Sequence, residues 1–176
     1  MKTKKIILVL SLMIFSGGFL FAQDYAYVGV TKCKMCHNKP TTGAQYKKWL
    51  EGPHAKAFEV LKSEKALAYA KKNGIADPSK EAKCLKCHTT AATVPANLNA
   101  GVKITEGVSC ESCHGAGKGY MIMTVMKDRN KSIAKGLVIP TEETCKKCHN
   151  KENPFYKEFN FAEYSKKIAH PNPAKK

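Results

Sequence analysis

The sequence is short of acidic residues, of histidines and of any pattern that predicts a sheet. It has 14 Asp and Glu against 30 Lys and Arg, a formal net charge of +16, and six histidines. No segment alternates apolar and polar residues clearly enough to predict a strand. With 43% hydrophobic and 25% charged residues over 176 positions, the composition excludes a disordered or fibrous chain and is typical of one globular domain.

A long hydrophobic segment is also missing, since the one apolar run, residues 6–15, is short for a membrane span. It follows a basic start, residues 1–5, and leads through small residues to Ala22. This pattern is typical of a secretory signal peptide over residues 1–22. We therefore expect cleavage after Ala22, a periplasmic or otherwise exported protein, and a single domain over residues 23–176. An uncleaved membrane anchor is the alternative.

All eight cysteines occur in pairs spaced as Cys-x-x-Cys, and a histidine follows each pair at once. Two cysteines at this spacing can bond to the two vinyl groups of one haem, and the adjacent histidine reaches the iron as its proximal ligand. Zinc sites with four thiolates, or disulfides, are the alternatives, but neither requires the histidines. We therefore predict four covalently bound haem c groups. The motif residues are Cys33, Cys36 and His37; Cys84, Cys87 and His88; Cys110, Cys113 and His114; and Cys145, Cys148 and His149.

Four haems in so short a chain would themselves form most of the core. We expect a mainly α fold of short helices and irregular chain wrapped around closely packed haems. Helical spacing and end signals predict a helix over residues 53–73, one that begins at Thr141, and one over residues 163–170 that the following proline ends. Residues 89–101 and 115–119 are predicted to be loops.

Only His54 and His170 remain outside the motifs, so one chain cannot supply two histidine ligands to each of four irons. On a helix His54 would share a face with Phe58 and Leu61, as a ligand flanked by apolar groups that cover a haem would. Either histidine could instead be an ordinary core or surface residue.

Four segments are shared with a known family: Tyr27-Val-Gly, the Trp49 to Phe58 segment, Gly107-Val-Ser-Cys-Glu-Ser-Cys-His-Gly-x-Gly, and the Phe159 to His170 segment. They resemble the tetrahaem cytochrome c-554 family, and the resemblance covers nearly the whole chain after residue 22. The linkers are shorter here and align poorly. The resemblance implies a mainly helical fold in which haems stack in closely spaced pairs and electrons pass between overlapping macrocycles.

The resemblance also implies sixth ligands for three of the haems. It makes His54 the distal ligand of the fourth haem, whose proximal ligand is His149. It pairs His170 with the third haem, on His114. It leaves the second haem, on His88, five-coordinate with an open distal face.

For the first haem, on His37, the family position of the distal histidine falls on Met123. A thioether can also ligate haem iron, and His/Met ligation would raise the potential of that haem. Met121 and Met126 lie close by, and methionines in a cluster are often apolar filler. An open first haem, or a histidine donated by another subunit, are the alternatives to Met123.

The predicted function is electron transfer between redox partner proteins through stacked haems. A basic surface could attract nucleic acid, an anionic membrane or an acidic protein, and export argues against nucleic acid. We therefore expect partners with an acidic docking surface, while peripheral membrane contact stays open. Some lysines would compensate the haem propionates. The shortage of histidines argues against a filament whose subunits exchange ligands.

The alternative function is a redox enzyme that binds a small nitrogen-oxide ligand, such as nitric oxide, at the open haem on His88. The resemblance allows it, because members of the family have been linked with nitric oxide reduction. Catalysis there would need an acid or base over the iron. Glu106 and Glu111 are available, but we expect both to be solvated or adjacent to propionates, so no catalytic residue is predicted.

Overall fold

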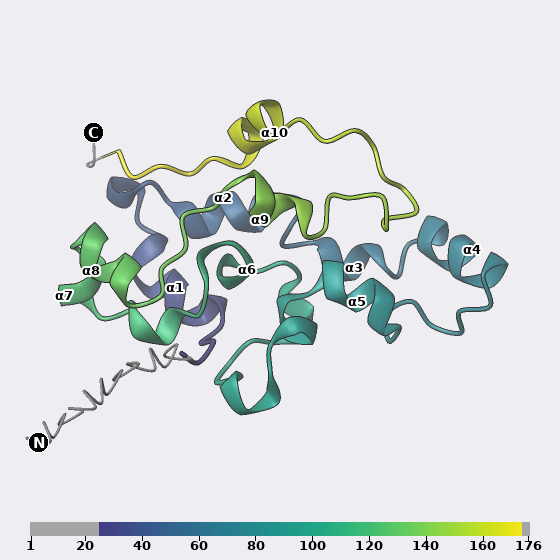
Figure 1. The fold of residues 1–176 in the computed structure, drawn as a ribbon, viewed down its shortest axis with the longest axis horizontal. Coiled ribbons are helices and arrows are strands. Elements are labelled where there is room, and N and C mark those ends of the chain that lie inside the picture. The colour runs from purple at the N-terminus through teal and green to yellow at the C-terminus, as the bar shows by residue number, and fades with distance from the viewer. Residues whose placement is uncertain (1–24, 174–176) are drawn as a thin grey trace, which may run out of the picture.

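The computed structural model describes residues 25–173 and is mainly helical, as predicted (Figure 1). The predicted signal peptide, residues 1–22, lies outside the described residues. The α-helices are short and are joined by turns and irregular chain. They are α1 (Val30–His37), α2 (Gln45–Glu51), α3 (Ala57–Val60), α4 (Glu64–Lys72), α5 (Ala82–His88), α6 (Cys110–His114), α7 (Met123–Met126), α8 (Arg129–Ala134), α9 (Glu142–Lys146) and α10 (Phe161–Ile168).

Short 3-10 helices fill several of the connections, two of them in the predicted loop 89–101. The only β pairing between residues 25 and 173 is an isolated bridge that joins Tyr27 to Asn99. Over the same residues, no helix has the length and apolar character needed to cross a membrane. The 3-10 helices are η1 (Pro40–Thr42), η2 (Thr90–Thr93), η3 (Ala96–Leu98), η4 (Ile104–Glu106) and η5 (Gly117–Gly119).

The predicted helix over residues 53–73 begins only at Ala57, so that His54 lies in the turn before it, and it is broken in two. Helix α3 ends at Val60, and the Ser63 hydroxyl accepts a hydrogen bond from the amide of Ala66 at 3.3 Å, which caps the start of α4. A serine that bonds a nearby amide favours a helix start over a helix interior, which explains the break. The helix expected to begin at Thr141 is confirmed as α9, with a capping box at its first turn.

Gly107 and Val108, just before the third motif, connect several segments in the central part of the fold. Val108 donates its amide to the His54 carbonyl at 3.0 Å, and its own carbonyl accepts from the Trp49 indole at 2.9 Å. Gly107 has φ 64°, and a Cβ there would lie 2.6 Å from the His54 carbonyl oxygen. Only glycine fits this conformation and this approach. Two of the segments that carry the family resemblance therefore touch each other here.

A buried carboxylate ties the N-terminal segment to the same part of the fold. Glu111 is 3% exposed and accepts hydrogen bonds from the backbone N–H groups of Val28 (2.9 Å), Gly29 (2.8 Å) and Gly117 (2.6 Å). Glu106 is 9% exposed and accepts a hydrogen bond from the backbone N–H of Val30 at 3.3 Å. Of the two alternatives expected for these carboxylates, solvation is therefore wrong, because the amides of residues 28–30 bond them in place of water, whereas adjacency to haem propionates stays a prediction.

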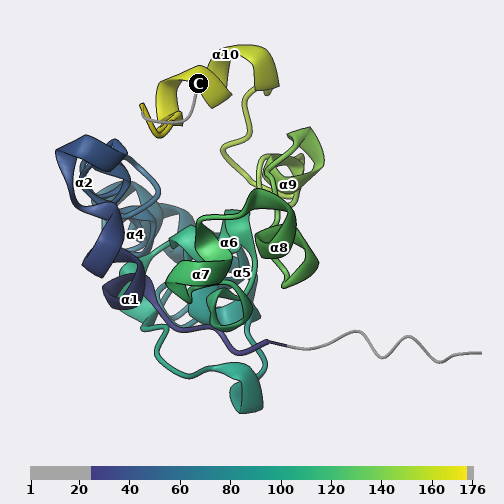
Figure 2. The ribbon, with the colours of Figure 1, turned by 90° about the vertical axis from the view of Figure 1, so that its left-hand side faces the viewer.

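The C-terminal segment, residues 141–173, is built differently. None of its residues is buried. Figures 1 and 2 show α10 at the outer edge of the molecule, reached through a long irregular stretch that follows α9. Helix α10 begins at Phe161, two residues before the predicted start, because the Asn160 side chain accepts from the amide of Glu163 at 3.1 Å and caps it.

Candidate haem-attachment centres

Each Cys-x-x-Cys-His motif forms a helical turn. Helices α1, α5 and α6 end at the motif histidines His37, His88 and His114. Helix α9 leads into the fourth motif, where the amide of His149 bonds the Cys145 carbonyl at 2.9 Å. Residues three apart on a helix lie on one side, so both cysteines of a motif can reach the same group. All eight cysteines are free thiols, without disulfides.

The motifs lie side by side. The thiols of Cys33 and Cys110, from the first and third motifs, lie close enough to shift each other's pKa, down for Cys33 and up for Cys110. In the second and fourth motifs, burial and the nearby Cys87 thiol raise the pKa of Cys148. The ion pair of Lys86 with Glu152 also joins the second and fourth motifs. The first motif therefore lies beside the third and the second beside the fourth, and the effect of Cys145 on the pKa of Cys113 shows that the third and fourth motifs are neighbours as well.

Two motif histidines face a histidine from outside the motifs. The ring centres of His54 and His149 are 6.0 Å apart with an angle of 71° between the planes, and those of His114 and His170 are 6.0 Å apart at 79°. One metal ion bound by two imidazoles through nitrogens at about 2 Å on either side would need ring centres about 6 Å apart. The residues present thus fit a bis-histidine iron at both places.

The outer nitrogens of four histidines already have partners. The Nδ1 atom of His88 lies 2.6 Å from the Ala57 carbonyl, that of His114 3.2 Å from the Val138 carbonyl, and that of His170 2.8 Å from the Ile168 carbonyl. A carbonyl can only accept, so Nδ1 carries the proton and Nε2 is left to bind iron, as is usual for histidine ligands. Nδ1 of His37 lies 3.3 Å from a side chain, Oε1 of Gln45.

Burial favours the neutral imidazoles that can ligate a metal. Burial, and to a smaller extent the neighbouring His149, lowers the pKa of His54 below its ordinary value. Burial likewise lowers the pKa of His149. Burial also lowers the pKa of His114, with a smaller contribution in the same direction from nearby His170. A neutral ring keeps a lone pair free for iron at pH values where an exposed histidine starts to protonate.

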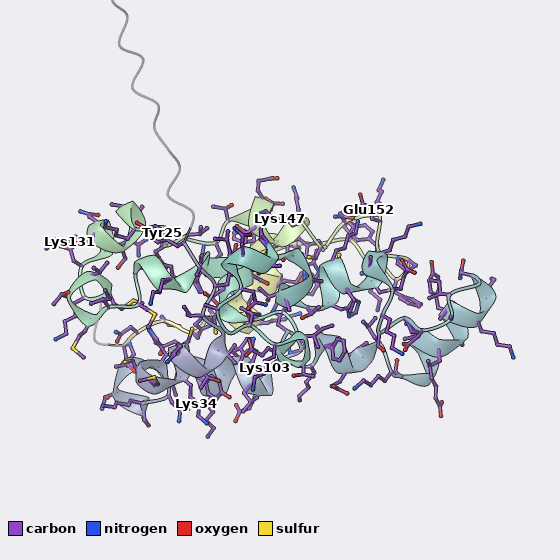
Figure 3. All side chains as sticks on the ribbon, turned by 90° about the horizontal axis from the view of Figure 1, so that it is seen from below. Tyr25, Lys34, Lys103, Lys131, Lys147 and Glu152 are labelled. Atoms are coloured by element: carbon purple, nitrogen blue, oxygen red, sulfur yellow. The ribbon has the colours of Figure 1, made fainter. Side chains whose placement is uncertain are left out.

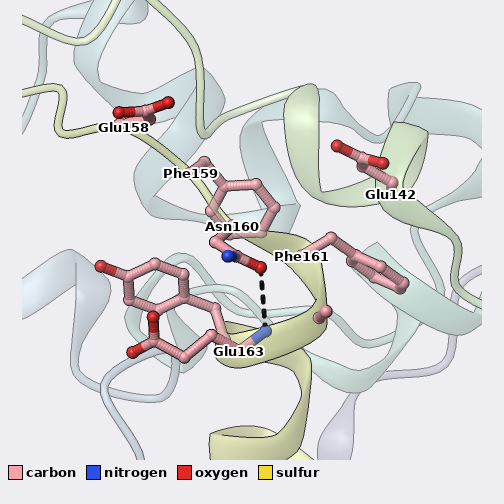
Figure 4. A pocket seen from close by; sticks show the side chains of 8 residues that line it. Glu142, Glu158, Phe159, Asn160, Phe161 and Glu163 are labelled. Carbon is pink, nitrogen blue, oxygen red and sulfur yellow. Dashed lines mark hydrogen bonds between the residues drawn. The ribbon is translucent and has the colours of Figure 1, made fainter.

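Aromatic rings continue outward from the fourth motif. Phe159 stacks on the His149 ring with centres 4.9 Å apart at 19°, and Tyr164 stacks on Phe159 at 5.5 Å and 14°. Phe159 and Tyr164 line a surface pocket together with Glu142 of α9 and further residues at the start of α10 (Figure 4). Phe159 is therefore positioned to hold the plane of the His149 imidazole.

The remaining predicted ligands are not brought together. His37 and His88 have no second histidine ring against them in the region that the structure describes, where all six histidines lie. Met123 lies on α7 with 61% of its surface exposed, so its pairing with His37 stays a prediction.

Some residues that shape the site gave no signal in the sequence. Gln45, and Ala57, Val138 and Ile168 with their accepting carbonyls, are ordinary residues at ordinary positions. Their role depends on which part of the chain lies across from each histidine. Phe159 could have been noticed as an aromatic residue soon after the fourth motif, but its stacking on His149 could not.

Comparison with known proteins gives one consistent result. A sequence model of the family described as "Cytochrome c554 and c-prime" matches residues 32–115, which contain the first three motifs. Cytochrome c-554 of Nitrosomonas europaea (strain ATCC 19718) is 29% identical over 155 residues, a match that covers 79% of this chain and 64% of that protein. The chain thus spans a little under two thirds of that relative.

The fold agrees with the sequence comparison. The solved reduced state of cytochrome c554 from Nitrosomonas europaea superposes with a TM-score of 0.55 and 25% sequence identity. The superposition covers 82% of this chain and 79% of that structure. The likeness therefore extends well beyond the residues that the family model matches.

Proposed function

We propose that this chain is a member of the cytochrome c-554 family, to which it is similar in sequence and fold, and that it is an exported, periplasmic tetrahaem cytochrome that carries electrons between redox proteins. The observation that carries this proposal is the pairing of motif histidines with the two histidines outside the motifs, each pair 6.0 Å apart between ring centres. A saturated iron that keeps both ligands changes little on reduction, which suits a carrier.

The motif residues would hold the groups, with two cysteines and one histidine for each. Haem c bound there supplies a centre that takes up and releases one electron at a time. His54 and His170 would complete the coordination at His149 and His114. The pairing of motif one with three, through Cys33 and Cys110, supports short steps between neighbouring centres.

The lysines support partners with an acidic docking surface. The sequence contains 30 Lys and Arg residues but only 14 Asp and Glu residues. Lys34 and Lys147 lie on opposite sides of the view in Figure 3, so positive charge is distributed around the molecule. Long-range attraction of this kind speeds encounter and leaves the complex weak enough to separate after transfer.

The haem count and spin states test the proposal. The purified protein should have the mass of the chain from residue 23 plus four haems, and its ferric spectrum should contain at least one high-spin centre with the rest low-spin. Electron exchange with a small acidic redox protein should slow as salt rises. Fewer than four haems, or four low-spin centres in a monomer, would contradict the proposal.

A second function, nitric oxide binding at the haem on His88, is favoured by one observation. The 2.6 Å contact with the Ala57 carbonyl is the shortest of the Nδ1 contacts described above. Such a bond raises the basicity of a histidine ligand. Nitric oxide added to the reduced protein should bind one haem rapidly, and consumption of nitric oxide with repeated turnover would favour an enzyme over a carrier.

A further inference from the structure

The first motif differs from the others in what holds its histidine. Nδ1 of His37 faces the side chain of Gln45, whereas three other histidines face backbone carbonyls. The Gln45 amide has a defined orientation, because its Nε2 donates to the Thr42 carbonyl, which can only accept. Oε1 must therefore be the atom that faces His37, so Nδ1 of His37 is the donor and Nε2 is free for iron.

The loop that carries Gln45 is internally bonded. The amides of Gly43 and Ala44 donate to the carbonyls of Pro40 and Lys39 at 2.9 and 3.0 Å, and the Thr42 hydroxyl donates to the Lys39 carbonyl at 2.9 Å. These contacts fix residues 39–45 as one unit, which we call the 39–45 loop.

The other side of this loop receives the C-terminal tail. A Cβ added at Gly43, where φ is 104°, would lie 2.4 Å from the Pro171 carbonyl oxygen and 3.2 Å from Cδ of Pro173. Pro171 directly follows His170, whose ring faces His114. The loop beside the first motif is therefore the seat of the tail that carries the distal histidine of the third.

We infer that the 39–45 loop positions histidines at two haems, orienting His37 through Gln45 and seating the His170 tail against Gly43. This inference rests on the proposed function, since it requires haem at the first and third motifs. Gln45 and Gly43 would act as positioning residues, because neither touches a reacting atom.

Gln45 should set the potential of the first haem. A stronger acceptor at Nδ1 gives the imidazole more negative character, which stabilises the ferric state. Gln45→Glu should therefore lower the midpoint potential of that haem, and Gln45→Leu should raise it. We expect about a tenfold change in the reduction equilibrium for each, which is 59 mV for one electron.

The midpoint potential of the first haem is measured in a redox titration followed by paramagnetic NMR, in which nitrogen-15 labelled histidine reports the His37 ring. The matched control is Lys48→Gln, an exposed change on α2 that alters net charge by the same one unit as Gln45→Glu. Opposite shifts for the two Gln45 variants, beyond that of the control, support the inference. Equal shifts in all three, or none, overturn it.

Gly43→Ala should loosen the His170 tail and convert part of the third haem from low-spin to high-spin, as His170→Ala does fully. The matched control is Gly74→Ala, where φ is also positive at 67° but no atom lies within 4 Å of the added Cβ. If Gly43→Ala does not fold, Pro173→Gly loosens the same contact more gently. Spectra of both variants that match Gly74→Ala overturn the inference.

Failure of the proposed function would look different. Protein mass reports whether the first and third motifs carry haem, independently of any variant. If haem is missing there, the proposed function fails and the inference falls with it. If all haems are present and the variants change neither potential nor spin state, the positioning inference alone is wrong.

Discussion

The two distal histidines predicted for the third and fourth haems are held by contrasting parts of the molecule. His54 lies in the central cluster, which we define as Thr90, Glu106, Gly107, Val108 and Glu111 with the backbone that they bond. His170 lies on the C-terminal segment, residues 141–173, in which no residue is buried. The Nδ1 partner of His170 is the carbonyl of Ile168, two residues away, so its orientation depends on local chain.

This difference means that two distal histidines with similar ring geometry need not be held with similar local stability. Both pairs have ring centres 6.0 Å apart, yet His54 is anchored within the buried central cluster, whereas His170 is carried by an exposed tail that rests against the 39–45 loop. Segments with few buried contacts open locally at low free energy, whereas densely bonded ones open only when the whole domain unfolds. The haem on His114 is accordingly the one whose distal ligand should exchange more readily.

Hydrogen exchange should give the largest contrast. The amides of Gly29 and Val108 bond buried or central acceptors, so they should exchange only through global unfolding. Those of Glu163 and Tyr164 in α10 should exchange through local opening. We expect opening free energies that differ by about 4 kcal/mol, roughly a thousandfold in rate, measured by NMR or mass spectrometry. Equal protection in both regions would abolish the comparison.

Removal of the buried carboxylate should be the most damaging single substitution. Glu111→Ala leaves three backbone N–H groups without their acceptor, and each buried unsatisfied donor costs about 1–3 kcal/mol. The free energy of unfolding should fall by at least about 3 kcal/mol in a denaturant titration. Glu152→Ala in the C-terminal segment, which loses only an exposed ion pair with Lys86, is the matched control and should have a small effect.

Gly107→Ala should lower the free energy of unfolding and also disturb the ligation of the fourth haem. The added Cβ would meet the His54 carbonyl at 2.6 Å and force φ away from 64°, at a cost of about 2 kcal/mol. Displaced His54 should appear as a new high-spin signal in the ferric spectrum. Gly74→Ala, with φ 67° and open space around it, should cost about 1 kcal/mol and leave the spectrum unchanged. An unchanged spectrum in both would show that Gly107 does not hold His54.

The comparison also shows what could be predicted from sequence. A mainly helical protein was predictable, because four haem motifs in so short a chain leave room only for short helices and irregular chain, and because helical spacing and end signals mark several of those helices. The α9 cap at Thr141 was predictable for the same local reason. His54 and His170 were predicted as candidate iron ligands because they are the two histidines outside the motifs, and the haems that they would ligate were predicted from the family resemblance.

The rest depended on contacts between distant segments. Glu111 lies 83 residues from Val28, and nothing in the sequence around either residue indicates that they meet. Glutamate is exposed in most proteins, so expecting a solvated carboxylate was reasonable and was overturned by tertiary structure. The break at Ser63 was missed because helical spacing continues across it.

The smallest expected effect concerns pH and the second carboxylate of the central cluster. Burial raises the pKa of Glu106 above its ordinary value of 4.5, with nearby Glu111 acting in the same direction and the amide of Val30 and Lys103 opposing. The folded protein therefore keeps this proton to a higher pH than the unfolded chain does. The stability that Glu106 contributes is full below pH 4.5 and is lost as pH rises through the raised pKa. Asp77 and Asp128, whose pKa values are lowered mainly by hydrogen bonds, act in the opposite sense. The measurement is therefore the difference in unfolding free energy between wild type and Glu106→Gln. That difference should move in favour of the Gln variant as pH rises above 4.5. A difference that stays constant with pH would place Glu106 in water and remove it from the central cluster.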